Sequence, residues 1–107
     1  MSSDDQEDSL FKALGNRVRR RMLDCLKESP ATTGTLCQAF PELDRCTVMQ
    51  HLKVLEQAGL VVARRNGRER WNHLNAMPIQ QLHERWIGSY AAYAAQGLLK
   101  LKQNVER

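Results

Sequence analysis

The sequence predicts a mostly α-helical single domain with one small β-hairpin. Over most of the 107 residues, apolar side chains recur every three or four positions, which is the spacing of amphipathic helices. Residues 60–74 differ, because two short runs rich in strand-favouring residues flank the pair Asn66-Gly67. Asn-Gly in that setting is a strong signal for a tight hairpin. A chain of this length supports one modest core and therefore one domain.

Four helices are expected before the hairpin. Asn16, Thr32 and Asp44 stand where they can cap the second, third and fourth helices, because their side-chain oxygens accept hydrogen bonds from free N–H groups at a helix start. Gly59 stands where a helix ends. The expected ranges are 9–15, 17–28, 33–40 and 45–58. The apolar residues at helical spacing are Leu10, Phe11, Leu14, Val18, Met22, Cys25, Leu26, Leu36, Ala39, Phe40, Val48, Leu52 and Leu55.

The hairpin is expected to turn through a type I′ turn with Asn66 and Gly67 at its centre, both with positive φ. This register sets Arg64 opposite Glu69, so that Arg64 is partly neutralised. Alternate residues of a strand point to opposite faces. The side expected to pack on the body contains Leu60, Val62 and Trp71. The side expected to meet an anion contains Arg65, Arg68 and Arg70.

A last helix is expected over residues 78–105, with Pro78 in its first turn. Such a helix would extend about 42 Å, which is longer than the rest of the body can cover. One alternative is that only its first half packs and its end frays. A two-fold dimer accounts better for the whole apolar stripe. The dimer interface is expected to contain Phe11, Trp86, Tyr90, Tyr93, Gly97 and Leu101.

The charge is distributed unevenly along the chain. The net charge is +4, but the first eight residues, "MSSDDQED", hold four acids and no base. Residues 1–8 are expected to be a disordered acidic tail. Residues 9–107, the folded domain, hold 16 basic and eight acidic residues, a net charge of +8. A basic body of this kind predicts a polyanionic partner.

The location and the redox chemistry are constrained as well. No apolar run approaches the roughly 18 residues that cross a membrane, and the N-terminus does not resemble a secretory leader. We therefore expect a cytoplasmic protein with no membrane partner. Cys25, Cys37 and Cys46 lack the close spacing of a zinc cage. Each is expected to be a buried or half-buried apolar residue.

The order of the predicted elements is that of a winged helix-turn-helix domain. In that fold the second helix of the pair enters the DNA major groove, and the hairpin, or wing, lies near the backbone or minor groove. His51 is expected to pack between helices. The residues expected to contact double-stranded DNA are Arg45, Thr47, Met49, Gln50 and Lys53 of the recognition helix and Arg65, Arg68 and Arg70 of the wing. Gln50 suits an adenine edge and Met49 a thymine methyl group.

The segments "ALGNRVRRRMLDCL" and "TVMQHLKVLEQAGLVVARRNGRERWNHLN", followed by a helix with Trp and Tyr, resemble an ArsR-type transcriptional repressor over residues 10–105. The resemblance implies a homodimeric repressor that releases its operator when an effector binds. Metal-sensing members carry Cys-x-Cys near the third helix, where this chain has Cys37 alone. Others use acidic and histidine ligands on the last helix, but no second histidine follows His83 and Glu84 there. We expect no metal, no cofactor and no stoichiometric zinc, and the effector stays unidentified.

Two other function classes were weighed. A winged-helix module that binds protein would use the same surface, and strong salt dependence of DNA binding distinguishes it from a repressor. An enzyme is not expected, because the sequence lacks paired catalytic carboxylates, a Ser-His-Asp set and a glycine-rich phosphate loop.

Overall fold

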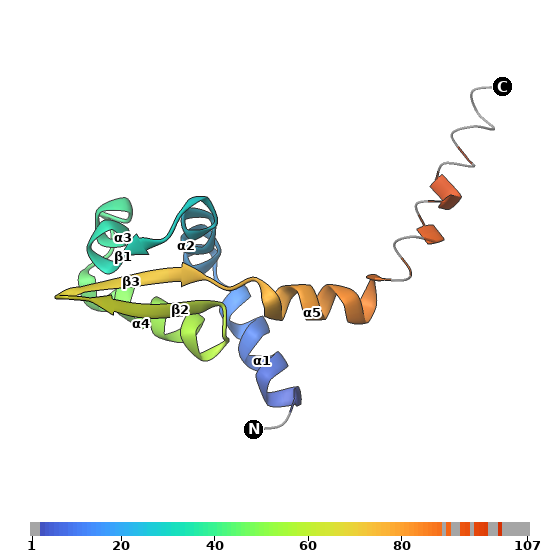
Figure 1. Cartoon of the computed structure of the whole chain (residues 1–107), viewed down its shortest axis with the longest axis horizontal. Coiled ribbons are helices and arrows are strands. Elements are labelled where there is room, and N and C mark those ends of the chain that lie inside the picture. The colour runs from blue at the N-terminus through green and yellow to red at the C-terminus, as the bar shows by residue number, and fades with distance from the viewer. Residues whose placement is uncertain (1–2, 89, 91–92, 95, 99–100, 102–107) are drawn as a thin grey trace.

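The computed structural model describes residues 3–88, 90, 93–94, 96–98 and 101. Figure 1 shows α2 and α3 above the strands and α1 and α4 below them, with the hairpin and the last helix extending in opposite directions. The elements are α1 (Ser3–Leu14), α2 (Arg17–Glu28), β1 (Ala31–Thr32), α3 (Thr33–Ala39), α4 (Arg45–Gln57), β2 (Val61–Asn66), β3 (Glu69–Leu74) and α5 (Met77–Trp86). The predicted mostly helical fold with a hairpin is confirmed.

The sheet has a third strand that the sequence analysis did not anticipate. Its order is β1-β3-β2, and both pairings are antiparallel. The strand β1 is only two residues long, and it pairs Ala31 with Asn72 and Thr32 with Trp71. It therefore supports the base of the hairpin and leaves the tip without a neighbour on that side.

The predicted starts of the second, third and fourth helices are confirmed by their caps. The side-chain oxygens of Asn16, Thr32 and Asp44 each accept a hydrogen bond from the backbone N–H three residues later, at 3.1, 3.0 and 2.7 Å. Gly59 follows α4 with a φ of +77°. This left-handed conformation is one that glycine adopts at little cost.

The core lies between α1–α4 and the base of the sheet. The predicted inward face of α4, formed by Val48, Leu52 and Leu55, is fully buried as expected. The other buried apolar residues are Leu10, Ala13, Met22, Leu23, Leu26, Leu36, Phe40, Ala58, Leu60 and Val61.

Several inward assignments were wrong. Cys25 and Ala39 are exposed, and Leu23 is buried where α2 turns toward the core. Cys46 is also exposed, and only Cys37 is half-buried as expected. Cys25 and Ala39 were assigned to stripes of larger apolar side chains, but the larger neighbours fill the space.

The predicted hairpin register was wrong by one residue at the turn. Asn66 pairs with Glu69, so Gly67 and Arg68 form the turn. Gly67 has a φ of +65°, and no residue other than glycine has a positive φ in the part of the chain described. A glycine with positive φ at the first central position is the pattern of a type II′ turn, whereas type I′ requires positive φ at both positions.

The same strand residues share a face as predicted, because the partner of each residue shifts by two positions, but the face that packs on the body is the opposite one. Val61 and Asn72 are buried against the body, while Val62 is 42% exposed and Trp71 lies on the outer face. Burial of the polar Asn72 decides the register, because its amide donates to the Ala31 carbonyl and the Thr33 hydroxyl.

The first helix starts earlier than predicted. Residues 3–8, expected to be a disordered tail, belong to α1. Asp4 and Asp5 lie in its first turn, where acidic side chains interact favourably with the helix dipole. Glu7 accepts a hydrogen bond from Arg85 of α5 at 2.5 Å. The acidic segment is thus tied to the body.

The last helix does not run unbroken over residues 78–105. It ends at Trp86, and Ile87 has a non-helical φ of −124°. Gly88, Tyr90, Tyr93 and Leu101 are helical, but residues 89, 91–92, 95, 99–100 and 102–107 lie outside the described residues. None of the described helices is long and apolar enough to cross a membrane.

Candidate nucleic-acid interface

The exposed face of α4 carries the predicted DNA-contacting side chains. Arg45, Met49, Gln50 and Lys53 are all exposed, because the opposite face of α4 is held in the core. The helix packs on α1, α2, α3 and β2, and it is therefore fixed on the body with one polar side free. A helix with one polar side free can enter the major groove.

Thr47 is the exception on this helix. Its backbone N–H, and then its hydroxyl, donate to the Asp44 carboxylate, and these hydrogen bonds hold the pKa of Asp44 below its ordinary value of 3.8. The residue is half-buried. Thr47 thus stabilises the start of the recognition helix, and the DNA contact predicted for it stays a prediction.

A groove of about 280 Å³ runs between the start of α3, the start of α4 and the wing. It brings together five of the eight predicted DNA-contacting residues from two elements that are separate in sequence. Its lining holds four guanidinium groups and one carboxylate. The lining residues are Thr32, Thr33, Gly34, Arg45, Met49, Arg65, Arg68, Glu69 and Arg70. Guanidinium groups bind phosphate with two parallel hydrogen bonds, so this groove suits a phosphate of the DNA backbone.

Arg64 lies on the other face of the wing. It is exposed and stands opposite Trp71, not opposite Glu69 as predicted. The expected neutralisation of Arg64 by Glu69 was therefore wrong. Arg65 stands opposite Arg70 on the groove side, where the two like charges repel unless an anion lies between or beside them.

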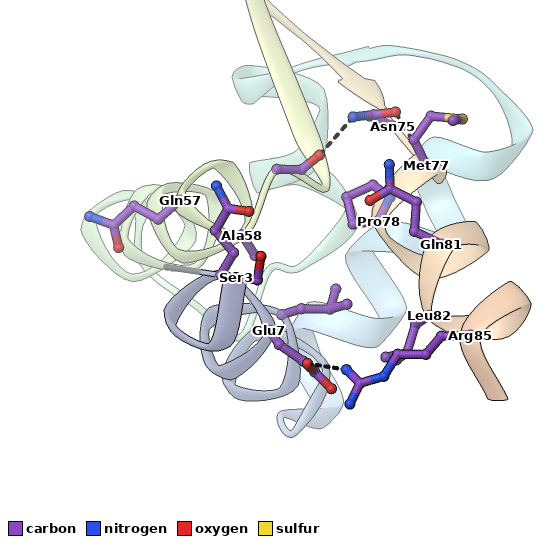
Figure 2. A pocket seen from close by; sticks show the side chains of 13 residues that line it. Ser3, Glu7, Gln57, Ala58, Asn75, Met77, Pro78, Gln81, Leu82 and Arg85 are labelled. Atoms are coloured by element: carbon purple, nitrogen blue, oxygen red, sulfur yellow. Dashed lines mark hydrogen bonds and ion pairs between the residues drawn. The ribbon is translucent and has the colours of Figure 1, made fainter. Parts of the chain in front are cut away.

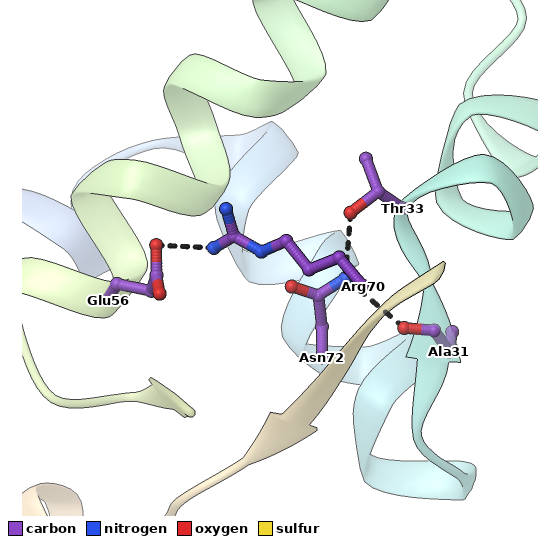
Figure 3. Close-up of polar contacts among 5 residues, drawn as sticks. All are labelled: Ala31, Thr33, Glu56, Arg70 and Asn72. Atoms are coloured by element: carbon purple, nitrogen blue, oxygen red, sulfur yellow. Dashed lines mark hydrogen bonds and ion pairs between the residues drawn. The ribbon is translucent and has the colours of Figure 1, made fainter. Parts of the chain in front are cut away.

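Arg70 differs from the other groove arginines because it already has a partner. Its guanidinium forms an ion pair with Glu56 of α4, drawn in Figure 3. Glu56 was not among the residues predicted from the sequence. Asn72 lies two residues from Arg70 on the same face of β3, and only the burial of Asn72 could have indicated that Arg70 points toward α4.

His51 lies between helices, as predicted. The Arg19 guanidinium donates to Nδ1 of His51 at 3.3 Å and also to the carbonyls of Lys12 and Ala13 at the end of α1. Burial lowers the pKa of His51 below its ordinary value of 6.5, and the charge of Arg19 lowers it further. His51 is thus held neutral inside the helix packing.

The predicted dimer residues are apolar and unburied in the single chain. The rings of Phe11 and Trp86 stack with centroids 6.0 Å apart, and they are 43% and 54% exposed. Tyr90, Tyr93 and Leu101 are more exposed still. Within the described residues, α1 and α5 thus join in one aromatic surface.

A second cavity lies between α1, the end of α4 and α5 (Figure 2). Its volume is about 440 Å³, and the Glu7–Arg85 ion pair lies in its wall. The Asn75 amide donates to the Gly59 carbonyl at 2.9 Å on another side. None of the predicted site residues lines it. In the part of the chain that the structure describes, no group of three or more His, Cys, Asp or Glu side chains is placed to hold a metal ion.

Comparisons with known proteins agree with this geometry. A model of a helix-turn-helix domain matches residues 14–64. The chain is 36% identical over 87 residues to the HTH-type transcriptional regulator YuzN of Bacillus subtilis, covering 76% of this chain and 95% of that protein. It is 31% identical over 72 residues to the transcriptional repressor SdpR of the same organism, covering 67% of this chain and 79% of that protein. The crystal structure of an ArsR family transcriptional regulator superposes with a TM-score of 0.72 at 26% identity, over 88% of this chain and 95% of that one.

Proposed function

Because the chain belongs to the ArsR-type winged helix-turn-helix transcriptional regulators, we propose that it is a homodimeric repressor of a near-palindromic operator. Its similarity to regulators, not to enzymes, also argues against catalysis. The repressor SdpR supports the direction of regulation. The protein would act in the cytoplasm, and an effector would release it from the operator.

The single observation that carries this proposal is the arginine groove between the recognition helix and the wing. A duplex that receives α4 in its major groove must pass a strand of its backbone across that groove. Arg45 at the start of α4 and Arg65 and Arg68 on the wing would then surround one stretch of phosphates. Phosphate contacts of this kind fix the register of a protein on DNA.

Base contacts would come from the exposed face of α4. Gln50 can make two hydrogen bonds to an adenine edge, and Met49 can contact a thymine methyl group. Arg45 can reach a guanine or a phosphate from the first turn, and Thr47 lies beside it. Lys53, further along the helix, suits a phosphate. The contact predicted for Arg70 remains a prediction, since its guanidinium is paired with Glu56.

A homodimer follows from the unburied aromatic surface of α1 and α5. We propose that Phe11, Trp86, Tyr90, Tyr93, Gly97 and Leu101 meet their copies across a two-fold axis. A surface on which several exposed aromatic side chains lie together is typical of an interaction site. Two recognition helices related by that axis read two half-sites about 10 base pairs apart.

The experiment that tests DNA binding is a salt titration with the pure full-length protein. Genomic fragments retained by the protein are sequenced, and a retained fragment is compared with an unrelated duplex of equal length. We expect the logarithm of the affinity to fall linearly with the logarithm of salt concentration, with the retained fragment preferred throughout. Absence of salt-dependent duplex binding would favour the protein-interaction module instead.

A further inference from the structure

We propose that Arg70 is a positioning residue, which acts through Glu56 to hold the wing at a fixed distance from the recognition helix. The proposal rests on the DNA-binding function proposed above and assigns a different role to one of its arginines. Arg70 then contributes to operator binding by geometry, while Arg65 and Arg68 contribute by contact.

The direction of the Arg70 side chain supports this role. Its Nη2 meets the Glu56 carboxylate, and the side chains of the two residues are 28% and 34% exposed. Its Nε and Nη2 are buried within the protein, and apart from the ion pair with Glu56 neither makes a hydrogen bond in the part of the chain described. The guanidinium edge that would grip a phosphate with two hydrogen bonds therefore faces α4, and it cannot turn to DNA without breaking the ion pair.

A second anchor stands two residues along the same face. Asn72 is fully buried, and its amide donates at 3.2 Å to both the Ala31 carbonyl and the Thr33 hydroxyl. Figure 3 shows the Asn72 amide beside the Arg70 side chain, with Glu56 on one side and Thr33 on the other. Arg70 and Asn72 thus connect β3 to both helices of the helix-turn-helix pair.

The position of Arg70 along the hairpin makes its ion pair important. The strand β1 pairs only with Trp71 and Asn72, so the tip from Arg65 to Arg70 is a two-stranded ribbon. Such ribbons are marginally stable alone. Asn72 anchors the supported base, and the Arg70–Glu56 pair is the polar contact that restrains the ribbon at the start of its unsupported part. Without it, the tip arginines would sample more positions relative to α4.

In the competing role, Arg70 contacts a DNA phosphate directly and Glu56 only competes with the phosphate for the guanidinium. The two roles predict opposite effects for Glu56→Gln. If Glu56 competes with DNA, its removal frees Arg70, deletes a negative charge and tightens binding. If Glu56 holds the wing in place, its removal weakens operator binding even though a negative charge has gone.

The test uses full-length wild type, Glu56→Gln, Arg70→Gln and the double variant. Each is titrated with a genomic fragment retained by the wild type and with an unrelated duplex, over a range of salt. The double variant has the net charge of the wild type, so its loss reports geometry. Glu28→Gln is the matched control, because it removes an exposed carboxylate at the end of α2 that does not line the groove.

We expect all three variants to lose up to about fivefold in affinity for the retained fragment, the scale of a partly exposed ion pair. The double variant should be no weaker than either single variant, which is the signature of one shared interaction. The salt dependence of the double variant should match that of the wild type. Glu28→Gln should bind as tightly as the wild type or slightly more tightly.

Amide hydrogen exchange in the hairpin gives a readout that needs no DNA. Exchange at residues 64–70 should become faster in Glu56→Gln and in Arg70→Gln, and it should be unchanged in Glu28→Gln. Tighter binding by Glu56→Gln with unchanged exchange would overturn the positioning role. If the wild type binds no duplex but the two variants still exchange faster than the wild type, the proposed DNA-binding function is contradicted and the restraint of the wing by the ion pair is confirmed.

Discussion

Gln50 is the side chain on which base selection is expected to depend most. It is exposed near the first turns of α4, the part of a recognition helix that reaches base edges. Gln50→Ala should cost about 1–3 kcal/mol on the preferred site and relax the preference at one base pair of each half-site. Binding-site selection with a randomised duplex measures this preference. Gln57→Ala at the far end of the same exposed face is the control, and an unchanged preference in Gln50→Ala would remove Gln50 from the base-reading set.

His51 should give the folded protein a pH dependence in the acidic range. Its pKa is lowered in the folded state, so the unfolded chain takes up a proton at a higher pH than the folded one. The stability that His51 contributes is therefore fully present above about pH 6.5, the ordinary histidine pKa. It is lost as the pH falls toward the lower pKa of the folded state. The melting temperature of the wild type should fall between pH 7.5 and 5.5, and in His51→Gln this fall should be smaller.

The control for this measurement is His83→Gln, because His83 is exposed on α5. The melting temperature of that variant should fall with pH as it does in the wild type. If His51→Gln keeps the full pH dependence, the histidine is not shielded by the helix packing and Arg19.

At the scale of elements, the two faces of the wing predict an order among its arginines. Arg65 and Arg68 line the groove, whereas Arg64 is on the outer face. Arg65→Ala and Arg68→Ala should weaken binding to all duplexes alike. Each should make the slope of log affinity against log salt shallower by about one unit per lost phosphate contact. Arg64→Ala should have a smaller effect in the same titrations, and the largest effect at Arg64 would place the DNA on the outer face.

The second, third and fourth helices were predictable from sequence because their signals are local. The caps Asn16, Thr32 and Asp44 act within three residues, and the spacing of Val48, Leu52 and Leu55 states which side of α4 is buried. The packing of His51 followed from the same helical wheel. No distant part of the chain is needed for these inferences, and the structure confirms them.

The wing was predicted less well because its register depends on distant residues. The Asn66-Gly67 pair indicates a hairpin, but either turn type is compatible with it. The choice is made by Asn72, whose buried amide bonds to Ala31 and Thr33 some 40 positions away. A polar residue in the core gives no hydrophobic signal, so neither the register nor the Arg70–Glu56 pair could be read from the pattern.

At the scale of the whole molecule, the arginine groove and the aromatic surface lie at opposite ends. The arginine groove is beside the wing, and the aromatic surface of Phe11 and Trp86 is beside α5 (Figure 1). This separation allows two copies to meet through one end while each presents the other end to DNA. A single recognition helix with one or two base contacts discriminates weakly, so specificity requires both copies.

Tyr93→Glu tests the proposed dimer interface. A carboxylate there would be buried without a partner in the dimer, which is costly, so the variant should become monomeric at micromolar concentration in sedimentation equilibrium. Its operator affinity should fall far more than its affinity for unrelated DNA. Gln96→Glu adds the same charge to an exposed position outside the proposed dimer interface and should leave the dimer intact. A monomeric wild type would contradict the proposed dimer directly.

The most direct test of sequence-specific binding by a dimer is a titration of the retained operator fragment in two forms, intact and with one half-site scrambled. The overall length and base composition stay the same. If two copies read two half-sites, the affinity for the scrambled form should fall most of the way to that for an unrelated duplex. Equal affinity for the intact and the scrambled forms would contradict the account.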